Sequence, residues 1–380
     1  MPTETKLPHA LAMLVRRAFR TLRPLVLVAC ALALGAGAAL AQQDRIVTKD
    51  GKEKIAKVVS EDYDGLTLAV DGGGTTGLRW KTIESVRYAS ADKYYRALDA
   101  FATGSPDEAL TQLEALAGDS KLRPVLRHGV LFHLARTYQK VGNADKALAT
   151  YEALLEAFPK TRYLLTVGAN LIALYRAKGT VGAGAKTLET RLTAAQGGSN
   201  DPTLQAGIGV LRGAILEEQG KHADAQRVFE STASLSGADA EVVAAAKLGL
   251  ARCAQRAGRT SDADTRYREL VLAEAPNEVL AGAWNGLGDL AFEPALQKRD
   301  PLGLREALFA YLRGVVLYVP GREGATDEYE RALAGTSKAF KALGELETDA
   351  ERKKTFLDRS RRRRDELASN YPQSRYLKDL

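Results

Sequence analysis

The segment that comes nearest to a known chemical motif is GTVGAGAKT, residues 179–187. A P-loop holds phosphates with glycine backbone amides and a lysine, and glycine must directly precede the lysine because the loop ends where its helix begins. Here Ala185 precedes Lys186, and the segment before it has a helical pattern instead of a strand. We therefore interpret these residues as a turn between helices. No helical pattern follows DGGGTTG, residues 71–77, so this second glycine-rich segment predicts a hairpin loop.

Histidine and cysteine are too few and too scattered to form a catalytic or metal site. His128 and His133 are five residues apart on one predicted helix, which places them on different faces, and His222 lies in a turn. Cys253 stands alone in a helical pattern, whereas Cys30 belongs to the apolar N-terminal segment. The sequence has neither an HExxH zinc motif nor a GxSxG nucleophile motif. These patterns predict a protein that is not an enzyme and that has no cofactor and no metal.

The densest run of charge is DRSRRRRDEL, residues 358–367. No aromatic residues alternate with the arginines, although stacking on aromatic rings is typical of proteins that bind single-stranded nucleic acids. Asp358–Arg362, Arg361–Asp365 and Arg362–Glu366 are each four residues apart, a spacing that favours ion pairs along a helix. The run therefore predicts a solvated helix face, and contact with anionic envelope polymers remains the alternative.

The first 41 residues have the features of a secretory signal segment. Four arginines precede the apolar stretch PLVLVACALALGAGAAL, and Ala39–Ala41 supply small residues for cleavage. RRAF also approaches a twin-arginine export motif, LVAC approaches a lipoprotein cleavage box, and an uncleaved membrane anchor remains open. The segment holds five Lys or Arg and one acid, so the formal charge of +7 falls to +3 without it. We expect export to a bacterial periplasm.

Residues 42–90 predict a small β domain. The runs DRIVTKDG, KIAKVVSED, LTLAVDGG and GLRWKTIESVRYA are short, rich in β-branched residues and separated by turn residues. Four or five such strands predict a small twisted sheet, closed into an SH3-like or Sm-like barrel.

Residues 91–380 predict helices that recur at a regular period. The turns TGSPDEAL, VGNADKAL, KGTVGAGA, QGKHADAQ and AGRTSDAD contain Gly104, Gly142, Gly179, Gly220 and Gly258, which are spaced by 38, 37, 41 and 38 residues. A period of this length indicates stacked structural repeats. In the second copy, the apolar residues of 144–158 recur at intervals of three and four, so this segment predicts one amphipathic helix of a hairpin.

These residues resemble the tetratricopeptide repeat family. The best copy has Leu131, Leu134, Ala135, Tyr138, Gly142, Ala147, Tyr151 and Pro159, and another has Trp284, Leu287, Gly288, Ala307, Tyr311 and Pro320. The resemblance implies six or seven helical hairpins, in which small residues allow close helix approach and Tyr151, Phe229, Tyr267 and Tyr311 fill the gap to the next hairpin. The predicted fold is therefore mainly α, an α-solenoid of such hairpins preceded by the small β domain.

Some features depart from the family pattern. The period exceeds the usual 34 residues of the family. About seven extra residues within FEPALQKRDPLGLRE separate the two helices of the Trp284 hairpin, and the copy around Gly179 lacks both the alanine and the aromatic residue. HEAT-type repeats would fit the period, but they would not require alanine and an aromatic residue four positions apart so often.

The resemblance implies a non-catalytic scaffold or adaptor that binds partner proteins or peptides on the concave surface of its repeats. Candidate groove residues on the first helices are Arg136, Gln139, Asn170, Arg176, Arg252 and Asn285. We expect protein partners of the envelope and no nucleic acid, and self-association is possible. The alternative is a carrier or assembly factor for envelope polymers that uses the β domain and the basic helix face.

Overall fold

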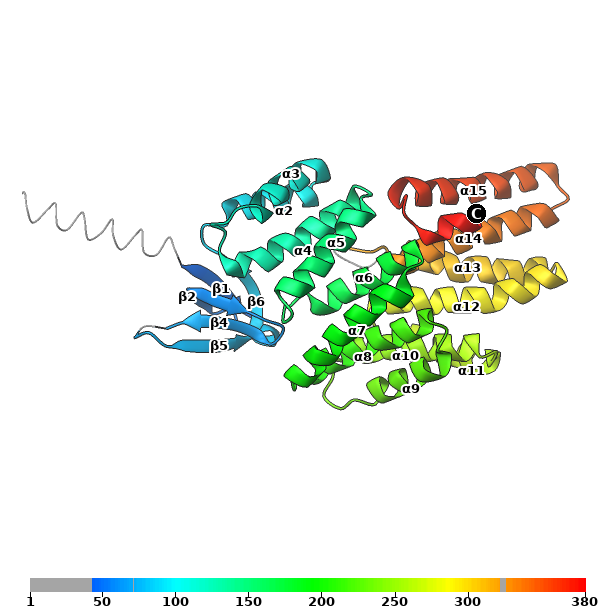
Figure 1. Ribbon diagram of the computed structural model, residues 1–380. Coiled ribbons are helices and arrows are strands. Elements are labelled where there is room, and N and C mark those ends of the chain that lie inside the picture. Colours follow the sequence, from blue (N-terminus) through cyan, green and yellow to red (C-terminus); the bar gives the residue numbers. More distant parts are fainter. Residues whose placement is uncertain (1–42, 71, 322–325) are drawn as a thin grey trace, which may run out of the picture. The chain divides into compact units, whose positions relative to one another are not determined.

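The computed structural model describes residues 43–70, 72–321 and 326–380. The predicted signal segment therefore lies outside the described residues. Two compact units are present, of which the first contains the strands and the second the helices (Figure 1). None of the helices in the described ranges combines the length and the apolar character that crossing a membrane requires.

The first unit has six strands in two antiparallel sheets, with the orders β2-β1-β6 and β3-β4-β5. The strands are β1 (Asp44–Thr48), β2 (Glu53–Ala56), β3 (Val58–Glu61), β4 (Gly65–Ala69), β5 (Thr75–Arg79) and β6 (Ile83–Arg87), with a short 3-10 turn at Trp80–Thr82. The sequence predicted one small sheet of four or five strands. There are two sheets because the run KIAKVVSED divides at Lys57, and its halves pair with β1 and β4 respectively.

A buried carboxylate joins the ends of this unit. The Asp44 side chain is fully buried and accepts hydrogen bonds from the backbone N–H groups of Val58 and Ala89, each at 2.7 Å. Ile46 and Leu66, one from each sheet, are among the fully buried side chains. The small unit therefore combines a short apolar core with a carboxylate that satisfies two backbone donors.

The second unit contains seven helical hairpins within the described residues (Figure 1). The helices, paired in chain order, are α2 (Asp92–Ala102) and α3 (Pro106–Ala117), α4 (Pro124–Lys140) and α5 (Ala144–Ala157), α6 (Leu164–Lys178) and α7 (Val181–Gly198), α8 (Pro202–Glu218) and α9 (His222–Ala233), α10 (Ala240–Arg256) and α11 (Thr260–Val271), α12 (Asn277–Lys298) and α13 (Pro301–Leu317), and α14 (Asp327–Leu346) and α15 (Ala350–Asn370). A 3-10 turn at Arg375–Asp379 follows. The predicted solenoid of six or seven hairpins is confirmed.

The recurring glycines form the turns inside the first five hairpins. Gly104, Gly142, Gly179, Gly220 and Gly258 all have φ between 68° and 88°. A residue with this left-handed conformation commonly ends a helix, and glycine adopts it without a Cβ clash. The sixth hairpin differs, because Arg299 takes this conformation at the end of α12. The extra residues around Pro294 lengthen α12, and only Arg299 and Asp300 separate it from α13.

Aromatic residues of the second helices pack against glycines of their own and the following hairpin. A Cβ added to Gly213 or Gly249 would lie 2.3 or 2.6 Å from the Phe229 ring. Tyr311 packs in the same way against Gly288 of α12 and Gly335 of α14. The predicted role of the aromatic residues between hairpins is therefore confirmed at these positions.

Candidate functional site

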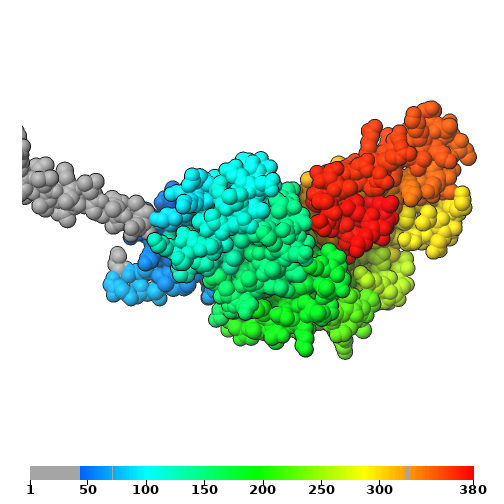
Figure 2. Space-filling model, turned by 45° about the horizontal axis from the view of Figure 1, so that its top comes forward, coloured from blue at the N-terminus to red at the C-terminus, as the bar shows by residue number. Residues whose placement is uncertain are grey.

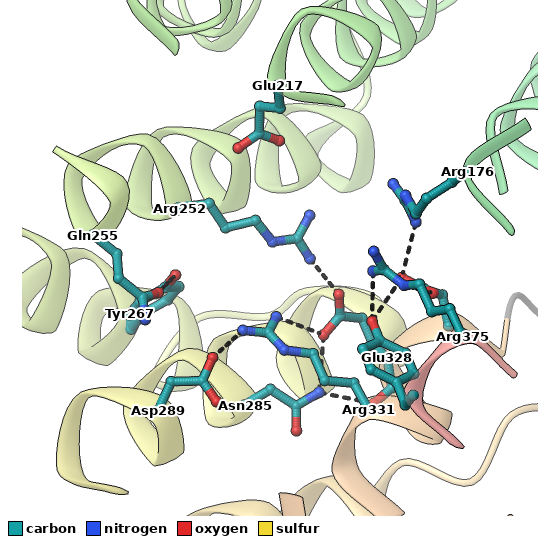
Figure 3. A network of polar contacts seen from close by, with 12 residues as sticks. Arg176, Glu217, Arg252, Gln255, Tyr267, Asn285, Asp289, Glu328, Arg331 and Arg375 are labelled. Atoms are coloured by element: carbon teal, nitrogen blue, oxygen red, sulfur yellow. Dashed lines mark hydrogen bonds and ion pairs between the residues drawn. The ribbon is translucent and has the colours of Figure 1, made fainter. Parts of the chain in front are cut away.

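The first helices of the third to seventh hairpins bring together a group of charged and polar side chains (Figure 3). We call this group the inner network. Its members are Arg176 of α6, Glu218 of α8, Arg252 of α10, Asn285 and Asp289 of α12, Asp327, Glu328 and Arg331 of α14, and Arg375 after α15. Hairpins that are far apart in sequence therefore meet through their polar residues.

Glu328 lies at the centre of the inner network and is buried. Its carboxylate pairs with Arg252 and with Arg331, and the Asn285 Nδ2 donates hydrogen bonds to both its Oε2, at 2.9 Å, and its backbone carbonyl, at 2.8 Å. Burial by itself would raise the pKa of Glu328, but the two guanidinium charges and the Asn285 amide hold that pKa at about 2. Glu328 is therefore ionised and tied to three helices, α10, α12 and α14.

Asp327 forms the outer part of the inner network. Its carboxylate receives the Arg375 side chain at two positions, Nε at 3.2 Å and Nη2 at 3.0 Å, and Arg176 Nη1 at 3.4 Å. Arg176 also pairs through Nε with Glu218, at 2.8 Å. Asp327 is one-third exposed and Arg176 is 19% exposed, so solvent reaches this part of the network. In Figure 2, the red C-terminal residues lie against the green part of the chain.

Two further contacts extend the network on either side. Arg331 pairs with Asp289, which in turn accepts a hydrogen bond from the Tyr311 hydroxyl at 2.6 Å. On the side of α8, Glu217 is buried near Arg252 (Figure 3). Burial raises the pKa of Glu217, although Arg252 and Arg256 oppose this effect. The two buried glutamates, Glu217 and Glu328, therefore have pKa shifts of opposite sign.

Three of the six predicted groove residues belong to the inner network: Arg176, Arg252 and Asn285. The other three lie elsewhere. On α4, Arg136 stacks against Phe101 and Phe132, and Gln139 accepts a hydrogen bond from the Tyr151 hydroxyl at 2.7 Å. Asn170 is half-buried on α6, on a different side of this helix from Arg176, because six residues correspond to about one and two-thirds turns.

The sequence did not identify the acidic partners. Asp327, Glu328 and Arg331 form the first turns of a helix whose sequence, DEYER, is typical of a solvent-exposed helix start. The partner of Glu328 is Arg252, 76 residues earlier in the chain, so local spacing contains no signal for it. A buried ion pair between hairpins can be found only after the hairpins are packed.

The two glycine-rich segments and Cys253 lie in ordinary turns, helices and strands of the fold. Gly179 ends α6, and the rest of GTVGAGAKT lies mainly in the first turns of α7, which has a helix before it. The described part of DGGGTTG, without residue 71, connects β4 and β5 and enters β5. Cys253 is buried, and burial raises the pKa of its thiol to about 12. Within the described ranges, no cluster of three His, Cys, Asp or Glu side chains could hold a metal ion.

The arginine run lies on the last helix, α15, where Arg361 and Arg364 are exposed. The ion pairs that form are Arg361–Asp358 at 3.2 Å, Arg363–Glu366 at 2.6 Å and Arg364–Asp365 at 3.1 Å. Their spacings of three and one residues differ from the predicted spacing of four. Side chains can adopt either the three- or the four-residue pairing on one helix face, and sequence spacing alone does not distinguish them.

A comparison with protein-family models identifies one hairpin. Residues 130–161 match the tetratricopeptide repeat. This segment includes most of α4, all of α5 and the proline that follows, so the resemblance predicted from the sequence is confirmed. No curated protein sequence matches the chain.

Solved structures with a similar fold include a tetratricopeptide repeat protein from Parabacteroides merdae, which is 14% identical, with a TM-score of 0.43, and aligns over 71% of this chain and 98% of its own. PilW, a type IV pilus biogenesis factor, is 16% identical over 66% of this chain and 97% of its own, with a TM-score of 0.37. A tetratricopeptide repeat protein of Thermus thermophilus is 20% identical over 49% of this chain and 92% of its own, with a TM-score of 0.36. At these identities and TM-scores, none of the three similarities gives information about the binding partners of this chain.

Proposed function

We propose that the protein is a non-catalytic scaffold of the bacterial cell envelope, exported to the periplasm, which binds partner proteins or peptides on the inner surface of its hairpins. The observation that carries this proposal is that first helices of the hairpins present arginines that already hold carboxylates of the same chain. Stacked hairpins generally bind extended segments on this surface. The partner segment would carry carboxylates that pair with arginines of α4 and α6.

The inner network divides the six candidates into two groups. Arg252 and Asn285 hold Glu328 and connect α10 and α12 to α14, so we assign them a structural role. Arg136, Gln139, Asn170 and Arg176 lie on α4 and α6, and we keep them as partner-contact candidates. Arg176 has the strongest case, because it lies at the solvent-accessible edge of the network.

The proposal can be tested by chemical crosslinking and affinity capture from intact cells. The double variant Arg136→Gln/Arg176→Gln removes two positive charges from the inner surface and introduces no new charge near Asp327 or Glu218. Arg252 is left intact, because its removal would leave the buried Glu328 with only one of its two guanidinium partners. We expect the wild type to capture a discrete protein and the double variant to lose most of it.

A matched control is Arg361→Gln/Arg364→Gln, which removes the same number of charges from exposed positions of α15. The control should capture as much partner as the wild type. Equal loss in both double variants would show a general charge effect and would contradict the inner-surface proposal. Retention by both variants would also contradict it.

A second candidate function is contact with anionic envelope polymers. The observation in its favour is that α15 exposes Arg352, Lys353, Lys354 and Arg362 in addition to its paired arginines. Such binding would depend strongly on salt and weakly on partner sequence, because exposed charges are screened by ions. Polymer binding that is lost in Arg361→Gln/Arg364→Gln and preserved in Arg136→Gln/Arg176→Gln would favour this function over the scaffold.

A further inference from the structure

The outer face of α13 carries large apolar side chains that are exposed. Leu302 is 68% exposed, Phe309 58%, Val316 65% and Leu317 59%. We call these four residues the outer stripe. Five of the ten large hydrophobic residues that are exposed in the described part of the chain lie on α13 or two residues beyond it, at Val319. Concentrated exposed apolar surface of this kind marks an interaction site more often than scattered residues do.

The spacing of the outer stripe fits helix-on-helix packing. Leu302, Phe309 and Val316 are each seven residues apart, so they form a nearly straight line along the helix. The opposite side of α13 packs into the core through Leu304, Ala307, Leu308 and Tyr311. α13 therefore has two apolar faces, of which one is satisfied within the chain and the other has a heptad-like repeat suited to a second helix.

The charges beside the outer stripe are arranged so that the same surface can pair with itself. Helical periodicity places Glu306 and Arg313 on one flank of the line and Arg305 and Leu312 on the other. If a second copy of the chain packs antiparallel, with a two-fold axis at Phe309, each flank of the line meets the same flank of the other copy. Glu306 then lies beside Arg313 of the other copy, twice, and the aliphatic part of Arg305 covers Leu312. In the centre, Leu302 meets Val316.

Both charged residues are exposed in the monomer and have neighbours on other helices. The Arg313 guanidinium lies 4.5 Å from the centre of the Trp284 ring, which orients it, and Glu306 lies near Arg268 of α11 and contributes to the raised pKa of that arginine. The antiparallel arrangement also opposes the two helix dipoles, which is favourable. We propose that a second copy of this chain docks antiparallel on the outer stripe of α13, forming a symmetric dimer.

The test is the dissociation constant of the purified protein, measured by sedimentation over a range of concentrations. Because the stripe is a small interface, we expect a weak dimer with a dissociation constant of about micromolar order. Phe309→Asp should weaken it by about a hundredfold or more, since the change occurs twice at the centre of the interface. Thermal unfolding at low concentration confirms that each variant folds.

Charge exchange tests the register. Glu306→Arg alone should weaken the dimer about tenfold or more, because it places like charges together twice. The double exchange Glu306→Arg/Arg313→Glu should restore it. A parallel dimer would instead pair Glu306 with Arg305, so restoration by Arg305→Glu in place of Arg313→Glu would overturn the proposal. A wild type that stays monomeric at high concentration, or a dimer that is insensitive to Phe309→Asp, would overturn it as well.

Discussion

The inner network spans the third to seventh hairpins, the outer stripe lies on α13 of the sixth, and the two surfaces satisfy their side chains in opposite ways. In the inner network, charged side chains have partners from another hairpin: the buried Glu328 has Arg252, and the half-buried Arg331 has Asp289. In the outer stripe, large apolar side chains such as Phe309 remain exposed within one chain. Polarity alone would have suggested the reverse, with charges facing solvent and apolar residues inside.

This difference indicates which surfaces are complete in the monomer. A carboxylate with two guanidinium partners and an amide donor needs no external ligand, so the C-terminal part of the inner surface serves to hold hairpins together. An apolar side chain in water gains free energy from any apolar partner. The outer stripe is therefore the surface of these hairpins that has most to gain from association.

The largest expected effect comes from breaking the inner network. Glu328→Ala should destabilise the protein by about 3–5 kcal/mol, because it removes the buried carboxylate that Arg252, Arg331 and Asn285 share. The measurement is chemical denaturation followed by circular dichroism. Asp358→Ala removes a carboxylate from the exposed pair with Arg361 and serves as control, with an expected loss of less than about 1 kcal/mol. Similar losses in the two variants would contradict a structural role for the network.

Acid should weaken the inner network in a defined range. Because the pKa of Glu328 is lowered from 4.5 to about 2 in the folded protein, its contribution is complete above pH 4.5 and is lost as pH falls towards 2. In Glu328→Gln, the free energy of unfolding should fall less steeply between pH 4.5 and 2 than in the wild type. Parallel curves would show that Glu328 does not titrate as described.

The apolar seam between the hairpins should respond to a single added methyl group. In Gly286→Ala, the new Cβ would lie 2.2 Å from the Tyr267 ring, so we expect a loss of about 1–3 kcal/mol. Gly182→Ala is the matched control, because nothing lies within 4 Å of a Cβ at that position of α7. The control should be stabilised by about 0.5–1 kcal/mol, as alanine is the better helix former.

The smallest effect on monomer stability is expected in the outer stripe. Phe309→Ser should change the free energy of unfolding by less than about 0.5 kcal/mol when measured at dilutions where the protein is monomeric, because the side chain is already 58% exposed. A loss comparable to that of Gly286→Ala would show that Phe309 belongs to the core and would remove the contrast between the two surfaces.

Local sequence pattern was sufficient for the hairpins. The pattern consists of a glycine at a fixed place in five turns and of an alanine and an aromatic residue in the helix that follows. These residues make contacts only within one hairpin or between neighbouring hairpins. Strands lie on both sides of Lys57, and no local sequence signal marks this residue as the point where one strand ends and the next begins. The division into two sheets was therefore not predicted.

The candidate site was predicted only in part. Arg176, Arg252 and Asn285 were predicted because they lie on the first helices of their hairpins, and all three belong to the inner network. Their partners Asp327 and Glu328 could not be selected, because contacts between residues 76 or 151 positions apart depend on the curvature of the whole stack. Curvature results from many small packing angles that single residues do not specify.

The most direct test of the proposed function is site-specific photocrosslinking in intact cells. A photoreactive residue at Ala169, which is exposed and lies seven residues before Arg176 on the same face of α6, would report on the inner surface. The same residue at the exposed Thr193 of α7 would report on the second helix of that hairpin. Inner-surface binding predicts a discrete crosslinked protein from position 169 and little or none from position 193. Equal crosslinking from both positions, or crosslinking from 193 alone, would contradict it.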